Sequence, residues 1–292
     1  MNKIAPLLLA SLSFAGAVVY IRSKRRSATP RLVLVGAGPG DCDLMTFAAA
    51  HELAKADVVI ADLLIPKALL ARFVPASAKL LIANKIKGNA HEAQSEIEKW
   101  TLDALKNGQY VVRLKGGDPF LYGRGGEEVV EFSKLGYQVK VVPGVSSALA
   151  GPASAGIPVT SRGVANQLAV CTVHGKNDTI PALIPKPFNP QRTVVFLMSV
   201  SRVEYMVTSL LREGYPKDTR VVVAERATLP NQRSLFCELE TLTSLVEAEL
   251  VQSPAVIIVG GAANGVPGMP LNVKWEEGMA SFSSRCNFSF GA

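Results

Sequence analysis

Two glycine-rich turns are the places where this backbone is barest and a ligand could approach it most closely. The longer one, VVRLKGGDPFLYGRGGEE at 111–128, begins as a β-strand and contains five glycines in eighteen residues. Asp118, Arg124, Glu127 and Glu128 surround those glycines. A simple connection between a strand and a helix needs fewer glycines than this, so we predict a ligand-binding loop, with an ordinary turn as the alternative.

The shorter turn, GAGPGD at 36–41, follows an apolar run and resembles the start of a dinucleotide fingerprint. Gly36 and Gly38 fit G-x-G-x-x-G, but the last position is Asp41, and Pro39 removes a backbone donor. An acid at this point opposes the binding of a pyrophosphate. The turn therefore suits a ligand that lacks phosphate or carries positive charge. An NAD-dependent oxidoreductase and a tight turn without a ligand are the alternatives.

The elements around these turns alternate between short apolar strands and helices. Strands are predicted in the segments RLVLVGAG, ADVVIAD, AKLLIAN, YVVRLK and YQVKVVPG, and helices over 44–56, capped by Asp43, and over 92–106. Strands without strict apolar–polar alternation are typical of a buried parallel sheet that is covered by helices on both faces. Glu127 and Glu128 suit the first turn of a further helix.

A second set of strands follows a connector that is rich in glycine, alanine, serine and proline. The connector, 143–163, is expected to hold one short helix. The strand segments are QLAVCTVHG, TVVFLMS, RVVVAERAT, SLFCELE and AVIIVGG, with helices near 203–213 and 242–249. We therefore expect an N-terminal α/β domain at 31–145, a C-terminal α/β domain at 146–265 and an irregular tail at 266–292.

Charge and composition exclude some classes of function. The net charge of the 292 residues is +7, but six bases and no acids precede Asp41, so the chain after Arg31 carries only +1. This distribution argues against a nucleic-acid-binding face. The four cysteines and three histidines have no metal-ligand spacing, which predicts no metal site and a reducing compartment.

The first thirty residues look like an anchor or a targeting segment. Residues 4–21 are eighteen uncharged residues followed directly by RSKRR. This length is the lower limit for a membrane-spanning helix, and the basic cluster favours a catalytic part that faces the cytoplasm. A secretory signal peptide and a mitochondrial presequence are the alternatives.

Taken together, the motifs resemble those of the tetrapyrrole methylase family. The segments that carry the resemblance are VGAGPGD, VVRLKGGDPFLYGRGGEE, VVPGVSSALAGPASAGIPVTSRG and SPAVIIVGG, in this order, and it covers about 31–261. It implies two α/β domains with an active-site cleft between them, a homodimer, and S-adenosylmethionine as the methyl donor. The branch that it matches best methylates two pyrrole carbons of uroporphyrinogen III, giving precorrin-2 for sirohaem synthesis. We expect methylation only, with oxidation and iron insertion left to other proteins.

The resemblance also implies roles for particular residues. By motif, the cofactor contacts are Pro39, Gly116, Gly117, Asp118, Leu121, Ser146, Ser147, Met198 and Ala227. Asp62 matches a suggested proton acceptor and Lys85 a suggested proton donor, although Asp62 after a strand equally suits a turn or cap. The porphyrinogen carries eight carboxylates, so its site should be cationic. Candidates for that site are Arg113, Lys115, Arg124, Arg162, His174 and Lys176.

Several positions depart from the family pattern. Cys42, Ser199 and Ala227 stand where Pro, Gly and Gly are common, and the segment after Lys85 is one residue longer than the bacterial form. These departures leave two alternatives open. One is a family member with a corrinoid, diphthamide or ribosomal RNA substrate, and the other is an inactive, membrane-tethered relative.

Overall fold

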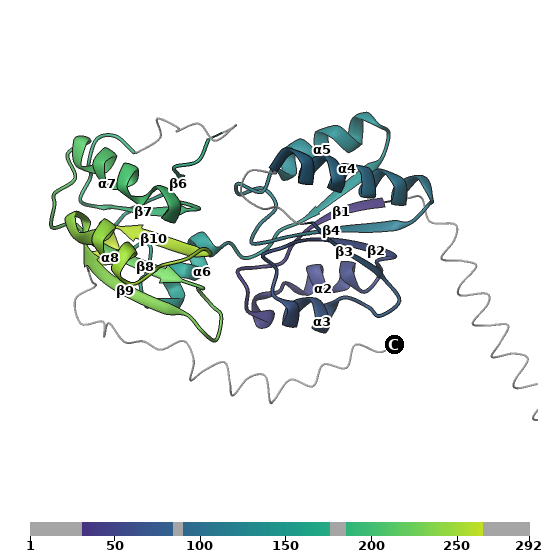
Figure 1. Ribbon diagram of the computed structural model, residues 1–292, viewed down its shortest axis with the longest axis horizontal. Helices are drawn as coiled ribbons and strands as arrows, with labels where there is room; N and C mark the ends of the chain where they lie inside the picture. The colour runs from purple at the N-terminus through teal and green to yellow at the C-terminus, as the bar shows by residue number, and fades with distance from the viewer. Residues whose placement is uncertain (1–30, 84–89, 176–184, 265–292) are drawn as a thin grey trace, which may run out of the picture.

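The computed structural model describes residues 31–83, 90–175 and 185–264, which form two α/β units (Figure 1). The first unit contains β1 (Arg31–Gly36), the 3-10 turn η1 (Cys42–Leu44), α2 (Phe47–Leu53), β2 (Val58–Asp62), α3 (Lys67–Phe73), β3 (Lys79–Ala83), α4 (Ala90–Lys106), β4 (Tyr110–Lys115), α5 (Gly125–Lys134) and β5 (Gln138–Val142). The prediction of two α/β domains is confirmed.

The first sheet has the strand order β3-β2-β4-β1-β5, and every neighbouring pair is parallel. Its strands are β-branched and apolar because both faces are covered. Val33, Val59 and Val112 pack with α2 and α3 on one face. Leu32 and Ile60 pack with α4 and α5 on the other face. Figure 1 shows these two helix layers on opposite sides of the sheet.

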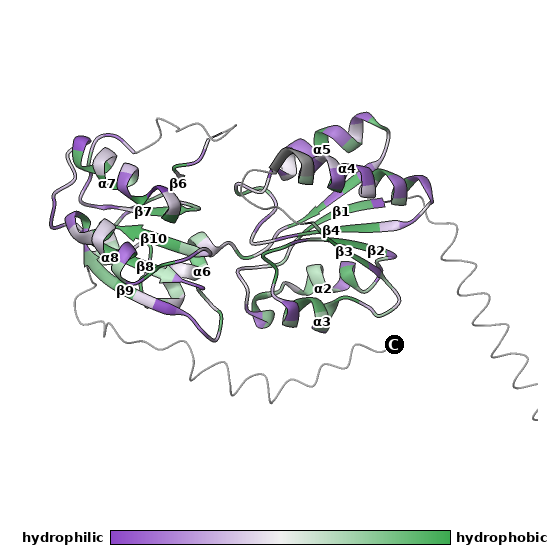
Figure 2. Ribbon diagram, viewed as in Figure 1, coloured by the Kyte–Doolittle hydropathy of each residue, from purple (hydrophilic) through white to green (hydrophobic). Residues whose placement is uncertain are grey.

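The second unit contains α6 (Ser147–Ser154), β6 (Gln167–Thr172), β7 (Arg192–Leu197), η3 (Val200–Arg202), α7 (Val203–Arg212), β8 (Arg220–Glu225), β9 (Arg233–Glu238), η4 (Leu239–Thr241), α8 (Leu242–Ala248), β10 (Ala255–Val259) and η5 (Gly261–Asn264). Its sheet has the order β6-β7-β10-β8-β9, with only β6 and β7 parallel. Helices α7 and α8 cover one face and α6 the other. In Figure 2 the strands of both sheets are largely green, whereas helices α4 and α5 contain many purple residues.

The predicted helix over 44–56 is shorter in the structure. Helix α2 begins at Phe47, and its N-cap is Thr46, whose hydroxyl accepts from the Ala49 amide at 3.1 Å. Asp43, the predicted cap, instead lies in η1 and pairs with Arg72. Helix α3 was not predicted, because a segment of seven residues is too short to show a helical period.

The prediction of a membrane-anchored protein with a cytoplasmic catalytic part is contradicted. Over 31–83, 90–175 and 185–264, no helix has the length and apolar character needed to cross a bilayer. Residues 4–21, on which the prediction rested, lie outside the described residues. The predicted tail at 266–292 also lies outside them.

Candidate active site

The two glycine-rich turns meet at one edge of the first sheet. Strands β1 and β4 are parallel neighbours, so both chains leave the sheet at the same edge. Gly117 donates to the Gly38 carbonyl at 2.7 Å, and Gly38 donates to the Gly117 carbonyl at 3.3 Å. From there the chain continues from β1 into α2 on one face and from β4 into α5 on the other. Open α/β sheets bind ligands at such a switch point. We use crevice for this place, where the loops after β1 and β4 leave the sheet.

Glycine is required where three backbones cross at this edge. A Cβ on Gly144 would lie 2.2 Å from the Gly117 carbonyl oxygen, and one on Gly36 would lie 2.6 Å from the same atom. Gly117 has a φ of +65°, which side chains rarely adopt. At Gly116, by contrast, no described atom lies within 4 Å of the missing Cβ position. Gly116 therefore presents open backbone, whereas its neighbours are packed together.

Asp118 fastens the loop after β4 to the connector between the domains. Its Oδ2 accepts from the Gly144 amide at 3.1 Å, and its Oδ1 accepts from the Phe120 amide at 2.8 Å. Ser146 caps α6 by accepting from the Ala148 amide at 3.1 Å. The Cα of Ser146 lies 4.0 Å from the missing Cβ position of Gly117. The predicted positions Gly117, Asp118 and Ser146 are thus neighbours, and Ser147 begins α6.

The same loops reach the second domain. Leu121 packs against the apolar cluster of that domain, which includes Ala227. The Tyr122 hydroxyl donates to the Val170 carbonyl at 2.9 Å. The Asp41 amide donates to the Thr228 hydroxyl at 3.2 Å. The loops after β1 and β4 therefore contact the second domain.

Met198 and Ala227 lie at a single edge of the second sheet. Strands β7 and β8 both run antiparallel to β10, and Leu197 and Ala224 both pair with Val256. Met198, directly after β7, is 50% exposed, whereas Ala227 is buried. Across the described residues, six non-glycine residues have positive φ, and five of them lie in the loops around the crevice: Tyr122, Arg124, Met198, Arg226 and Thr228. Such strain concentrates at functional sites.

The predicted substrate-binding cations fall into two groups. Arg124 and Arg162 are exposed, as a carboxylate-rich substrate would require. Arg124 pairs with Glu127 one turn along α5, at 2.6 Å. Arg162 lies in a turn closed by hydrogen bonds between Ser161 and Ala165, and it forms no ion pair with any described residue. His174 is half-buried, with its Nε2 3.2 Å from the Ser201 hydroxyl, and Lys176 lies outside the described residues.

Arg113 and Lys115 are not placed to contact a substrate. They are 1% and 2% exposed, because both point from β4 toward α5 rather than into the crevice. Lys115 Nζ lies 3.0 Å from Glu128 Oε1, and Arg113 pairs with Asp62. Burial and the charge of Arg113 lower the pKa of Lys115 to about 8, against the opposing effect of Glu128. This arrangement corrects the expectation that the two cations form part of a substrate site.

Of the two predicted proton-transfer residues, the structure describes Asp62 but not Lys85. Asp62 is the last residue of β2, and its side chain is 23% exposed, next to the end of β4. Lys85 lies outside the described residues. Glu128 was treated in the sequence only as a first-turn acid of α5. The signal that could have found Glu128 is the pair Arg113 and Lys115 on one face of β4, because two buried cations need a buried anion.

The residues around the crevice fit S-adenosylmethionine better than a phosphorylated nucleotide. The loops at 36–41 and 116–124 each contain an acid, and their one base, Arg124, pairs with Glu127. The open backbone at Gly116 leaves space that a side chain would fill. A cationic, phosphate-free nucleoside suits such a lining. The loops after β1, β4, β7 and β8 would hold S-adenosylmethionine.

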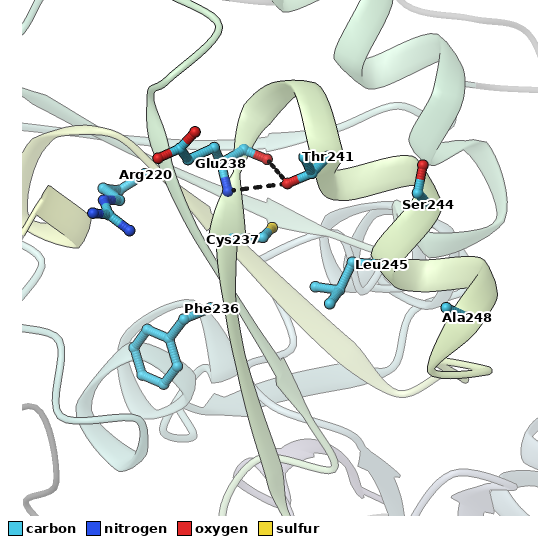
Figure 3. Close-up of a pocket in the computed structure, with 8 residues that line it drawn as sticks. All are labelled: Arg220, Phe236, Cys237, Glu238, Thr241, Ser244, Leu245 and Ala248. Atoms are coloured by element: carbon cyan, nitrogen blue, oxygen red, sulfur yellow. Dashed lines mark hydrogen bonds between the residues drawn. The ribbon is translucent and has the colours of Figure 1, made fainter.

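A separate cavity of about 510 Å³ lies on the second domain, away from the glycine loops (Figure 3). It lies between β9 and α8, on the opposite face of that sheet from α6. Burial raises the pKa of its Cys237 thiol to about 11, so the thiol is protonated at neutral pH. No group of acidic, cysteine and histidine side chains within the described ranges has the arrangement of a metal site.

The fold defines a two-domain α/β protein whose glycine-rich loops lie where the first domain contacts the second. Residues 31–243 match the tetrapyrrole (corrin/porphyrin) methylases. The chain belongs to this family.

Individual relatives support the same placement. The chain is 46% identical over 233 residues to a probable uroporphyrinogen-III C-methyltransferase of Schizosaccharomyces pombe, covering 80% of this chain and 46% of that protein. It thus spans about half of that relative. It is 39% identical to the uroporphyrinogen-III C-methyltransferase of Methanocaldococcus jannaschii, covering 81% of this chain and 98% of that protein. The crystal structure of uroporphyrin-III C-methyltransferase from Thermus thermophilus with S-adenosylhomocysteine has a TM-score of 0.69 at 36% identity, over 80% of this chain and 99% of that one.

Proposed function

We propose that this chain transfers methyl groups from S-adenosylmethionine to two pyrrole carbons of uroporphyrinogen III, giving precorrin-2 for sirohaem synthesis. The observation that carries the proposal is the hydrogen-bonded pairing of Gly38 with Gly117, which brings both glycine turns to one crevice. The relative from Methanocaldococcus jannaschii is matched over 98% of its length, so the region shared with this chain accounts for nearly all of that methyltransferase.

The cofactor site that we propose comprises Pro39, Gly116, Gly117, Asp118, Leu121, Ser146, Ser147, Met198 and Ala227. When bound, S-adenosylmethionine supplies a methyl group on a positively charged sulfur. The chain's part is to hold that sulfur and the pyrrole carbon in line, which the short, strained loops suit. Asp118, already fixed by two backbone amides, keeps Gly116 and Gly117 in place and adds negative charge beside them.

For proton transfer we propose Asp62 as the acceptor and Lys85 as the donor. When the pyrrole carbon gains a methyl group, the C–S bond breaks and sulfur keeps its electron pair. The positively charged ring must then lose a proton to a base, from an atom other than the methylated carbon, which already carries a side chain. Asp62 has a partly exposed carboxylate at the end of β2, the edge at which the glycine turns also leave the sheet. We propose Arg124 and Arg162 as contacts for the substrate carboxylates.

We also make proposals for the domain boundary and the oligomeric state. We propose that the domain division lies near residue 145, since α6 packs on the second sheet and begins at Ser147. We also propose a homodimer, by resemblance to the family. Light scattering on the purified chain tests the dimer, and a monomer at micromolar concentration would refute it.

The experiment that tests the function is methyl transfer itself. The protein is incubated with uroporphyrinogen III and S-adenosylmethionine labelled in the methyl group. We expect two labelled methyl groups in each product molecule. No label in the tetrapyrrole would refute the proposal. Fluorescence titration with NADH and with S-adenosylhomocysteine distinguishes an oxidoreductase, which would bind the first and not the second.

A further inference from the structure

Four charged side chains form a chain of contacts from the interior of the first domain to the crevice. Lys115 Nζ lies 3.0 Å from both carboxylate oxygens of Glu128. Arg113 Nε lies 3.6 Å from Glu128 Oε1. The other end of the Arg113 guanidinium pairs with Asp62 Oδ1. The side chains of Lys115, Arg113 and Glu128 are 2%, 1% and 3% exposed, whereas that of Asp62 is 23% exposed. The contacts therefore lead to a single partly exposed group.

Stability alone does not account for these residues. Ile60, Val111 and Phe132 line the same face of the sheet, so aliphatic side chains at 113, 115 and 128 would continue the apolar core. Replacing a buried ion network with apolar residues of similar size is often neutral or stabilising. The geometry indicates instead that the network acts on Asp62, its one partly exposed member.

The Arg113 guanidinium is held on three sides. Its Nη1 donates to the Ile60 carbonyl at 3.2 Å and to the Leu114 carbonyl at 3.0 Å. Its Nε forms no hydrogen bond within the described residues, and the Glu128 carboxylate is the anion that faces it. Glu128 is held in turn by Lys115 and, at 3.5 Å, by Gln94 of α4. Glu128 thus fixes the side of the guanidinium that the backbone carbonyls leave open.

We infer that Glu128 is a positioning residue for the proposed proton acceptor. Clamped by Lys115, it orients Arg113, and Arg113 holds the Asp62 carboxylate at the edge of the crevice. This inference rests on the proposed function, because it gives Asp62 a role in methyl transfer. It assigns a task to two buried cations that the sequence had linked with substrate.

Glu128→Gln is the perturbation that separates position from packing. The amide has nearly the volume of the carboxylate and still offers one oxygen to Lys115. The substitution removes the anion that faces Arg113 Nε, and in either orientation of the amide its NH₂ group meets another donor, Lys115 Nζ or Arg113 Nε. Without that anion the guanidinium is expected to move away from Asp62. A displacement of about 1 Å in a catalytic array can lower the rate about a hundredfold.

Glu52→Gln is the matched control. The Glu52 side chain is 4% exposed and lies in the same domain, where it accepts from Lys140 at 2.8 Å and from the Tyr110 hydroxyl. Tyr110 begins β4 and Lys115 ends it, so Glu52 lies at the opposite end of the strand from the crevice. Burial raises the pKa of Glu52, but hydrogen bonds from Lys140 and Tyr110 outweigh that effect and lower the pKa to about 2. The control therefore also removes a buried, multiply bonded charge.

The experiment has a structural arm and a kinetic arm. Crystal structures of Glu128→Gln and Glu52→Gln report the Arg113–Asp62 contact, and methyl transfer gives kcat and KM for both. We expect the contact to be lost only in Glu128→Gln. We also expect kcat of that variant to fall about tenfold to a hundredfold, with KM for S-adenosylmethionine within about twofold. Adding Glu128→Gln to Asp62→Asn should lower kcat no further, because Glu128 acts through Asp62.

The outcomes are separable. An intact Arg113–Asp62 contact in Glu128→Gln, an equal loss of kcat in Glu52→Gln, no effect of Asp62→Asn, or a further loss in the double variant would each overturn the inference. A wild-type protein that transfers no methyl group to uroporphyrinogen III would refute the proposed function, and the structural arm would still decide what Glu128 holds. If Glu128→Gln does not fold, Glu128→Asp keeps the charge but shortens the reach. A smaller fall in kcat, absent on the Asp62→Asn background, is then expected.

Discussion

Replacing Gly144 with alanine perturbs the crevice without changing the identity of any proposed ligand-contacting residue. The new Cβ would lie 2.2 Å from the Gly117 carbonyl oxygen, and ordinary contact begins at about 3.4 Å, so one backbone must move by 1.2 Å. It also lies 2.8 Å from Gly36, so the strand end on that side blocks the retreat of residue 144. The movement therefore falls on Gly117, which is one of the proposed cofactor contacts.

The expected magnitudes follow from that displacement. Forcing a methyl group into a packed site costs about 1–3 kcal/mol, which lowers the Tm of a domain pair of this size by about 2–12 °C. If moving the cofactor loop relieves half of that strain and ligand binding must restore it, affinity for S-adenosylhomocysteine falls by about twofold to tenfold. Calorimetric titration and thermal unfolding measure the two effects. Gly126→Ala is the control, because no described atom lies within 4 Å of its Cβ position, in helix α5. Unchanged affinity and Tm in Gly144→Ala would refute the argument.

Three further predictions use the strain, the buried charge and the contact between the domains. Met198→Gly relieves a φ of +56°, so it should raise stability by up to about 1 kcal/mol while weakening S-adenosylhomocysteine binding. The control Leu250→Gly relieves a φ of +49° and should raise stability without changing the binding. Equal affinities of Met198→Gly and wild type in titration would remove Met198 from the site. The Glu52 pKa of about 2 lies below its ordinary 4.5, so its charge stabilises the fold above about pH 4.5, and this contribution is lost as the pH falls toward 2. Urea unfolding should therefore show wild type losing up to about 3 kcal/mol more than Glu52→Gln between pH 5 and pH 2, and parallel curves would contradict the assignment. Tyr122→Phe removes the hydroxyl that donates to the Val170 carbonyl, and this should lower the free energy of unfolding by about 0.5–1.5 kcal/mol. An unchanged Tm would show that this contact does not stabilise the protein.

The strands were predictable because each is a short apolar run that ends in glycine, proline or a charged residue. The run RLVLVG became β1 and AVIIV became β10, within two residues of the expected limits. The order β3-β2-β4-β1-β5 was not predictable, because buried parallel strands of similar composition do not encode which neighbours they take. That order is what makes β1 and β4 neighbours and brings the two glycine turns together.

The candidate site was partly readable from local sequence. Glycines at 36 and 117 signalled close backbone approach, and the structure has them together with Gly144, which was not singled out from the sequence. The roles of Arg113 and Lys115 were misjudged, because a two-residue spacing on a strand fixes which face the side chains share but not whether that face is open. Glu128 was overlooked because its position in the sequence indicated only the first turn of a helix. Its partners, Arg113 and Lys115, lie on a strand, and the sequence does not show that they contact it.

The central claim is that the loops after β1 and β4 bind the methyl donor together with the loops after β7 and β8. A crystal structure of the wild-type chain soaked with S-adenosylhomocysteine tests it most directly. We predict density for the nucleoside in contact with Pro39, Gly117 and Ala227, and with its sulfur facing the side of the crevice that holds Asp62. Density at another surface, or a complex in which Gly117 and Ala227 both lack contact with the ligand, would contradict the account.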